Sequence, residues 1–176
     1  MRALLIIDLQ NDFARPGGAL YFEGAETIIP FILGKVLEYK KEGLPIITTQ
    51  DWHQQDDLEF QRFGKHCVAG SEGAELVKEL LVELQDYQEY YSVKKRRFSA
   101  FFETNLDELL KELGIQEIDV CGLVTNICVL HTVEELCNRD IVVRVWEKGV
   151  KSYDSGEHEW ALKHMERILG AQVVKS

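Results

Sequence analysis

The sequence lacks a hydrophobic stretch long enough to cross a membrane, and the apolar run at its N-terminus is short. A membrane-spanning helix needs about 20 consecutive apolar residues. The N-terminal run holds only about six before Asp8 interrupts it, which is typical of a strand and not of a signal peptide. The sequence therefore predicts a cytoplasmic protein without a membrane partner.

Positive charge is also in short supply. The chain has 20 Lys and Arg against 30 Asp and Glu, a formal net charge of −10. Such a balance argues against nucleic acids and anionic membranes as partners, although residues 94–97 form one local basic run. Repeats and low-complexity segments are missing too. A chain of 176 residues, 45% of them hydrophobic, suits a single α/β domain that spans residues 1–176.

Cysteine pairs at close spacing are absent. The four cysteines include no CxxC pair and no framework typical of small secreted proteins. Free thiols in a reducing compartment are the simplest interpretation. The same absence argues against a redox protein, although a metal-sensing or redox-binding role for Cys67, Cys121 and Cys128 remains as an alternative.

Apolar runs and helical patterns alternate along the whole chain. This order predicts βαβ units and a mostly parallel six-stranded sheet with helices on both faces. The expected strands cover residues 3–9, 44–49, 90–93, 118–121, 141–146 and 172–175. The expected helices cover residues 25–42, 73–84, 105–113, 126–135 and 155–169, the last capped by Asp154 or Ser155.

Cys128 lies in the stretch around which the chain is organised. The predicted strand 118–121 ends at Gly122, and helical spacing begins near Asn126. Cys128 would then lie in the first turn of a helix just beyond the carboxyl end of a strand. Open α/β sheets bind their ligands there, and a helix N-terminus stabilises a thiolate. A buried, inert thiol is the alternative for this residue.

Charged residues follow two other predicted strands. Asp8 ends an otherwise apolar strand, where an unpaired charge would be costly to bury, whereas Asp12 fits a surface turn. Lys94 and Lys95 follow the strand at residues 90–93 and point to opposite faces of it. One of these two lysines can lower the pKa of Cys128 and keep Asp8 ionised. A solvated basic face is the alternative for most of this run.

Residues 50–73 form a long segment without a strong period, and such segments in compact domains are usually functional. Asp51 and His53 lie on one side of an extended chain, and Glu59 and His66 follow at spacings that a folded loop could close. Two histidines with two carboxylates suit zinc, iron or manganese.

Aromatic residues stand beside these polar groups in the sequence. Phe13, Trp52, Phe63 and Phe98 could form the walls for a flat, apolar ring, although aromatic side chains more often belong to the core. Leu20 and Ile127 complete the set of residues that we expect to contact the substrate.

Five segments of the chain together resemble the isochorismatase-like cysteine hydrolases, and within them the nicotinamidases. They follow the family's order and read IIDLQNDF with GGAL, TQDWH, KHCVAGS, KKRRFSAFFETNLDELL and CGLVTNICVLHT. Each segment is modest evidence by itself, but the combination is specific. The resemblance implies a three-layer α/β/α fold, hydrolysis of nicotinamide to nicotinate and ammonia, and a role in NAD salvage.

The family's catalytic triad of Asp, Lys and Cys corresponds by resemblance to Asp8, Lys95 and Cys128. Lys95 is preferred to Lys94 because the family pattern is K-x-x-x-S-A-F, and SAF begins at Ser99. The resemblance makes Cys128 the nucleophile that forms a thioester with the substrate.

The resemblance also implies a cis peptide bond between Leu123 and Val124. The backbone N–H groups of Val124 and Cys128 would form the oxyanion hole.

The family's metal site usually holds one Asp and three His. Here the resemblance assigns Asp51, His53, Glu59 and His66 as ligands, with Glu59 in place of one His as in some nicotinamidases. The Pro-Pro pair that often precedes the last ligand is replaced by Gly64-Lys65, which alters the expected pocket wall.

Relatives that cleave isochorismate or ureido compounds generally lack this metal set, so the set favours nicotinamide as substrate. Zinc is the first choice of metal, and the pyridine nitrogen is its expected ligand from the substrate. A hydrolase of another small amide or ureido compound is the alternative function. The oligomeric state stays open, with a homo-oligomer as one option.

Overall fold

The computed structural model describes residues 1–175. Within this range six strands form one sheet in the order β3-β2-β1-β4-β5-β6, and every neighbouring pair is parallel. The strands are β1 (Arg2–Ile7), β2 (Ile46–Asp51), β3 (Tyr90–Lys95), β4 (Glu117–Leu123), β5 (Val142–Lys151) and β6 (Gln172–Val174). The α/β class and the six-stranded parallel sheet predicted from the sequence are confirmed.

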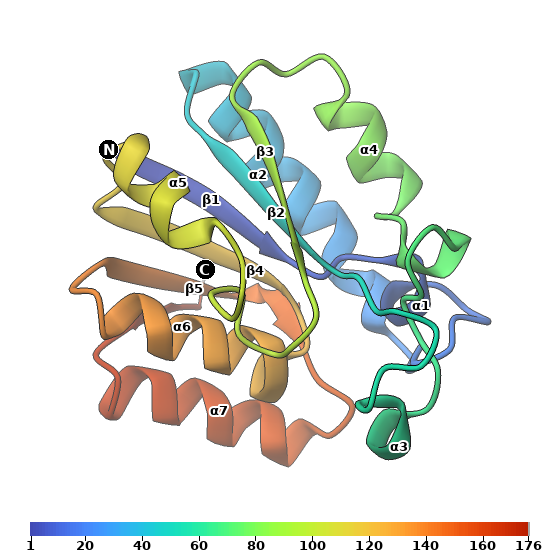
Figure 1. Ribbon diagram of the computed structural model, residues 1–176. Helices are drawn as coiled ribbons and strands as arrows, with labels where there is room; N and C mark the ends of the chain where they lie inside the picture. The colour runs from blue at the N-terminus through green and yellow to red at the C-terminus, as the bar shows by residue number, and fades with distance from the viewer. Residues whose placement is uncertain (176) are drawn as a thin grey trace.

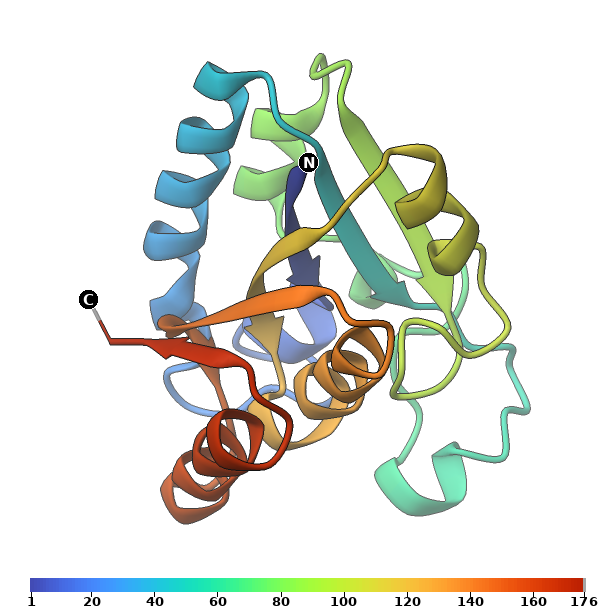
Figure 2. The same cartoon turned by 90° about the vertical axis from the view of Figure 1, so that its left-hand side faces the viewer.

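Helices cover both faces of this sheet, as Figures 1 and 2 show. One face carries α2 (Ile29–Glu42) and α4 (Lys78–Leu84), and the other carries α5 (Leu106–Glu112), α6 (Leu130–Cys137) and α7 (Ser155–Arg167). Three short segments border the carboxyl edge of the strands: α1 (Asn11–Ala14), η1 (Ala25–Ile28) and α3 (Phe60–Phe63). The arrangement is three layers, as expected.

The central strand β1 shows why the sheet forms. Its residues 3–7 are fully buried, because alternate side chains pack into the two helical layers. Leu5 belongs to the apolar cluster under α5, α6 and α7, whereas Leu4 belongs to the cluster under α2 and α4.

The strand order reverses between β1 and β4. The chain runs outward from β1 through β2 to β3, and then returns to β4 and runs outward through β5 to β6. Open parallel sheets bind ligands at such a switch point, beyond the carboxyl ends of the strands. Gly122 pairs with Ile7 there, and a Cβ on it would lie 2.0 Å from the Ile7 carbonyl oxygen. Only glycine fits this close approach of the two strands.

The predicted helix 73–84 is wrong in its first part. The structure has a 3₁₀ turn, η2 (Glu72–Ala74), then extended chain, and α4 begins only at Lys78. The extended chain forms backbone hydrogen bonds with the segment after β1. The Asn11 amide donates to the Glu75 carbonyl, and the Val77 amide donates to the Leu9 carbonyl. Tertiary pairing thus replaces the local helical preference.

The predicted helix 126–135 is also modified. It starts as a π-helical turn, η3 (Thr125–Val129), and continues as α6. Strand β5 runs to Lys151, past the predicted end at residue 146, and its pairing with β4 shifts register between Val120 and Gly122. Asp154 caps α7 by accepting the Glu157 amide, which decides between the two predicted caps. No helix within residues 1–175 is long and apolar enough to cross a membrane.

Candidate active site

Asp8, Lys95 and Cys128, called here the triad cluster, meet at the switch point. Asp8 follows β1 directly, Lys95 ends β3, and Cys128 lies in η3 after β4. The Lys95 Nζ lies 2.7 Å from Asp8 Oδ2 and 3.4 Å from Cys128 Sγ. All three side chains are buried. The structure therefore brings together the three residues that the resemblance selected.

The neighbouring residue Lys94 points the other way. It is exposed, and its Nζ lies over the ring of Trp52, 3.6 Å from the ring centroid. Alternation along β3 therefore places Lys95, not Lys94, in the triad cluster. Trp52 stands apart from the other aromatic residues predicted to contact substrate. Its ring is taken up by Lys94 and does not line the cavity described below, because residues next to each other in an extended chain face opposite sides.

Burial shapes the electrostatics of the triad cluster. It raises the pKa of Asp8 to about 6, against the lowering effect of the Lys95 charge. Burial also raises the pKa of the Cys128 thiol above its usual range, and Lys95 opposes this shift as well. The Thr49 hydroxyl donates a 2.6 Å hydrogen bond to Asp8 Oδ1. At neutral pH the cluster therefore holds a thiol beside an ionised carboxylate that can accept its proton.

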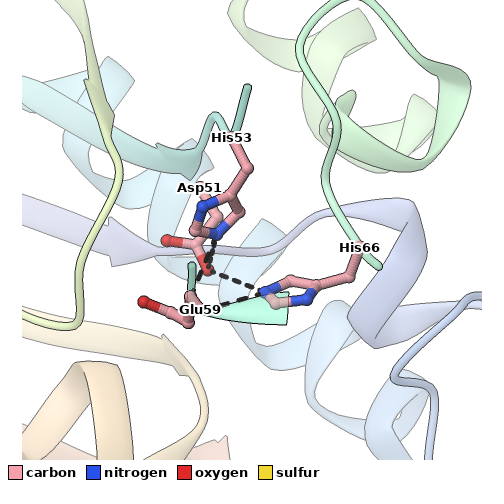
Figure 3. A group of neighbouring side chains, drawn as sticks. All are labelled: Asp51, His53, Glu59 and His66. Carbon is pink, nitrogen blue, oxygen red and sulfur yellow. Dashed lines mark ion pairs between the residues drawn. The ribbon is translucent and has the colours of Figure 1, made fainter. Parts of the chain in front are cut away.

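Asp51, His53, Glu59 and His66, called here the metal cluster, converge on one another (Figure 3). The cluster adjoins the triad cluster through the ion pair of Asp51 with Lys95. All four side chains are buried, and one ligand atom of each lies within 4.8 Å of the others. Both histidines turn Nε2 inward: His53 Nε2 lies 3.6 Å and His66 Nε2 3.8 Å from Asp51 Oδ2. Glu59 Oε1 lies 4.0 Å from each of these nitrogens.

The hydrogen-bonding pattern of the metal cluster fits a divalent cation. Buried polar atoms normally have partners, yet the inward-facing His53 Nε2 has no hydrogen-bond partner among the described residues. The outward nitrogens are held in place: His53 Nδ1 lies 3.1 Å from Asp57 Oδ2, and His66 Nδ1 lies 2.8 Å from the Gly64 carbonyl oxygen. Metal-binding histidines are oriented in this way. Two imidazoles and two carboxylates suit zinc and, with added ligands, iron or manganese.

Asp51 connects the two clusters. Its Oδ1 accepts from Lys95 Nζ, while its Oδ2 faces the two inward histidine nitrogens. Asp8, Asp51 and Cys128 also lie close enough to resemble a second metal site. The Lys95 ammonium occupies the space among them, so their charge is already balanced by a side chain.

A small cavity opens between the two clusters, lined by Asp51, Glu59 and His66 on one side and by Cys128 on the other. Five residues predicted to contact substrate line it, namely Phe13, Leu20, Phe63, Phe98 and Ile127. Tyr153, which was not among the predicted residues, also lines the cavity just beyond the end of β5. Its position after a strand at the carboxyl edge was the available signal.

The peptide bond between Leu123 and Val124 is cis, as the resemblance implied. Both residues line the cavity, beside Cys128. The assignment of the Val124 and Cys128 amides as an oxyanion hole stays a prediction.

Asp12 is not the simple surface turn residue that the sequence suggested. Its carboxylate accepts the Cys67 amide at 2.7 Å and the Ala19 amide at 3.0 Å, and it is only partly exposed. Cys67 follows the metal-cluster residue His66, so Asp12 fastens one end of that loop to α1. Gly73 leaves room for this carboxylate, since a Cβ there would lie 2.2 Å from it.

Comparison with known proteins agrees with this geometry. The family profile described as Isochorismatase domain matches residues 2–176. The chain belongs to the isochorismatase family of hydrolases. The crystal structure of nicotinamidase/pyrazinamidase PncA from Bacillus subtilis is 34% identical, covers 99% of both chains and superposes with a TM-score of 0.93.

Two further solved structures show the range of this family. Pyrazinamidase of Pyrococcus horikoshii, solved in complex with zinc, is 28% identical over 99% of both chains, with a TM-score of 0.88. N-carbamoylsarcosine amidase from Thermoplasma acidophilum is 30% identical over 99% of this chain and 95% of that one, with a TM-score of 0.84. Family membership is therefore compatible with more than one small amide as substrate.

Proposed function

We propose that this isochorismatase-family protein is a nicotinamidase, a cysteine amidohydrolase that converts nicotinamide to nicotinate and ammonia. The observation that carries the proposal is the position of the buried triad cluster beside a four-residue metal cluster, in one cavity with aromatic walls. A thiol, a proton acceptor and a site for ring recognition are thereby available to one small molecule.

Asp8 starts the reaction by accepting the proton of the Cys128 thiol. Its pKa of about 6 leaves the carboxylate ionised at neutral pH. That pKa also lies near the operating pH, as the pKa of an effective catalytic base should. The Lys95 ammonium, 3.4 Å from Sγ, stabilises the thiolate that forms. The thiolate attacks the carboxamide carbon, and the amide N–H groups of Val124 and Cys128 are the donors assigned to the oxyanion.

Breakdown of the tetrahedral adduct completes the first half-reaction. The C–N bond breaks, Asp8 returns its proton to the leaving nitrogen, and ammonia departs from a Cys128 thioester. Asp8 then accepts a proton from water, whose oxygen attacks the thioester carbon. The C–S bond then breaks, Asp8 returns this proton to the Cys128 sulfur, and the acid product leaves and ionises to nicotinate.

A divalent cation, with zinc as the first choice, would be held by Asp51, His53, Glu59 and His66 and would supply a Lewis-acidic partner for the pyridine nitrogen. The chain's own contribution to ring binding comes from Phe13, Phe63 and Phe98, which line the cavity between the two clusters. Phe63 and Phe98 meet edge to face with ring centroids 5.7 Å apart, so they form a continuous apolar wall.

Hydrolysis of an N-carbamoyl compound is the second candidate, because the triad cluster itself does not require an aromatic substrate and one relative in structure is an N-carbamoylsarcosine amidase. The alternative of a redox or metal-sensing binding protein without enzymatic turnover has less support. Burial raises the pKa of the Cys67 and Cys121 thiols far above their usual range, which disfavours thiolate chemistry at both.

The test is ammonia release from nicotinamide by zinc-reconstituted protein, with Cys128→Ser as the matched control. We expect release that the control lacks, and slower release from benzamide, which has the same shape without the ring nitrogen. N-carbamoylsarcosine serves as the third substrate. Turnover of N-carbamoylsarcosine without turnover of nicotinamide would show that the proposed substrate is wrong and that the catalytic role of the triad cluster is right. Undiminished turnover by Cys128→Ser would overturn the mechanism.

A further inference from the structure

Asp57 lies behind the metal cluster and contacts two of its members. Its Oδ2 lies 3.1 Å from His53 Nδ1, on the side of the ring away from the other ligands. Its Oδ1 accepts the backbone amide of Glu59 at 2.9 Å. One carboxylate therefore orients the imidazole of one ligand and the backbone of another.

The contact with His53 decides which nitrogen carries the proton. A carboxylate can only accept, so the proton of neutral His53 resides on Nδ1. Nε2 is then left with its lone pair, pointing at Asp51 and Glu59, as Figure 3 shows. This is the tautomer that a metal ion needs, and the buried Nε2 has no hydrogen-bond partner among the described residues.

Arg97 holds Asp57 in turn. Its Nη1 donates to both Asp57 oxygens, at 2.9 and 3.1 Å, and lies 3.6 Å from Glu59 Oε2. The Asp57 side chain is only 6% exposed, so it needs a partner for its charge. Arg97 supplies this partner, so the Asp57 charge is balanced outside the metal cluster.

Arg97 also touches the triad cluster. Its backbone carbonyl oxygen accepts a 3.0 Å hydrogen bond from Lys95 Nζ. Within the basic run at residues 94–97, Lys95 has the inward position expected of it. Arg97 is a second member with inward contacts, which the sequence did not indicate.

We propose that Asp57, held by Arg97, is the positioning carboxylate of the metal cluster: it selects the metal-binding tautomer of His53 and fixes the loop that carries Glu59. The pair acts through these two ligands and touches neither substrate nor reacting atoms. The inference rests on the metal site of the proposed function, and its test reads metal binding separately from turnover.

The experiment compares the zinc affinity of metal-free wild type, Asp57→Asn and Arg97→Gln by competition with a chromophoric chelator. Asp56→Asn and Arg96→Gln are matched controls, because they make the same chemical changes at exposed neighbouring positions. Loss of such a supporting contact typically costs 10–100-fold in metal affinity. We expect the zinc dissociation constant to rise by about that factor in Asp57→Asn, by less in Arg97→Gln, and to stay unchanged in both controls.

Cobalt(II) gives a second readout that a merely structural role would not move. We expect the visible absorption of the Co²⁺-loaded protein to change in Asp57→Asn, because the geometry of His53 changes, and to match wild type in Asp56→Asn. Turnover of nicotinamide by Asp57→Asn should approach that of wild type at saturating zinc. Circular dichroism of each metal-free variant establishes that it is folded.

Three results would overturn the inference. One is zinc affinity of Asp57→Asn within twofold of wild type. Another is a loss of turnover that persists at saturating zinc, because Asp57 would then act on the triad cluster or the fold. The third is a wild type that binds neither zinc nor cobalt, which would also remove the metal from the proposed function. Ammonia release would still test the triad independently in that case.

Discussion

The triad cluster and the metal cluster adjoin the same cavity but are built in different ways. The members of the triad cluster come from three separate strand ends, brought together by the sheet. The metal cluster comes from one continuous stretch, from the end of β2 to the residue before Cys67. The first depends on strand order, whereas the second depends on side chains, such as Asp12 and Asp57, that hold a loop closed.

This difference has a consequence for mutations. A change in the triad cluster alters charges that are locked into a rigid sheet, so chemistry should be lost while the metal site persists. A change in the loop should affect metal binding and local stability first. Asp51 is the one residue that belongs to both, through Lys95 on one side and the two histidines on the other.

Asp8→Asn is expected to have the largest effect. The amide cannot accept the thiol proton, and positioned acid–base groups typically contribute 10²- to 10⁴-fold. We expect ammonia release from nicotinamide to fall by about that factor, with zinc affinity unchanged. A variant that kept more than a tenth of the wild-type rate would show that another group accepts the proton.

Metal removal should reduce activity less than Asp8→Asn does, and it should act on substrate binding rather than on the thiol. We expect a sample stripped with a chelator to show a raised KM for nicotinamide, recovered on addition of zinc, because the ring nitrogen loses its partner. Cys128 should still be alkylated by iodoacetamide, as measured by mass spectrometry, because Asp8 and Lys95 remain in place. Loss of alkylation in the stripped protein would mean that the two clusters are not separable.

Asp12→Ala tests how the loop is held. It leaves the amide of buried Cys67 without its 2.7 Å acceptor, and an unsatisfied buried group costs about 1–3 kcal/mol. We expect the free energy of unfolding in urea to fall by that amount, together with weaker zinc binding. Asp86→Ala, at an exposed turn, is the control. Equal stability of the two variants would contradict the fastening role of Asp12.

The smallest effect is expected on the triad side, from Asp154→Ala. Loss of the N-cap of α7 costs about 1 kcal/mol. We therefore expect a lower melting temperature. We expect little change in kcat, although α7 contacts η3 where His158 Nδ1 lies 2.9 Å from Thr125 Oγ1. Ser155→Ala, at the adjacent position, should leave the melting temperature nearly unchanged. A larger loss of melting temperature in Ser155→Ala than in Asp154→Ala would identify Ser155 as the N-cap.

Much of this site could be predicted because the relevant patterns are local. The apolar run ending at Asp8, the strand-to-helix change before Cys128, and the spacing of Asp51 and His53 can all be read in the sequence. The roles of Asp12, Asp57 and Arg97 could not. Each acts on a group far away in the chain or across a turn, and nothing in their own neighbours distinguishes them from ordinary surface charges.

The helix predicted from residue 73 failed for a related reason. Its helical pattern is real, but the pairing of Leu9 and Asn11 with this segment outweighs local propensity. Trp52 lies outside the cavity lining because residues adjacent in sequence face opposite sides of an extended chain.

By itself, the sequence determined the alternation of strands and helices, and hence the parallel sheet, because hydrophobic periodicity is a local property. It also determined which chemical groups stand at the strand ends. Tertiary structure alone decided how those groups meet: the contacts of Lys95 with Asp8 and Cys128, the shared position of Asp51, and the inward turn of both histidine rings. These outcomes depend on strand order, burial and the pairing of buried charges, which only the folded chain brings into contact.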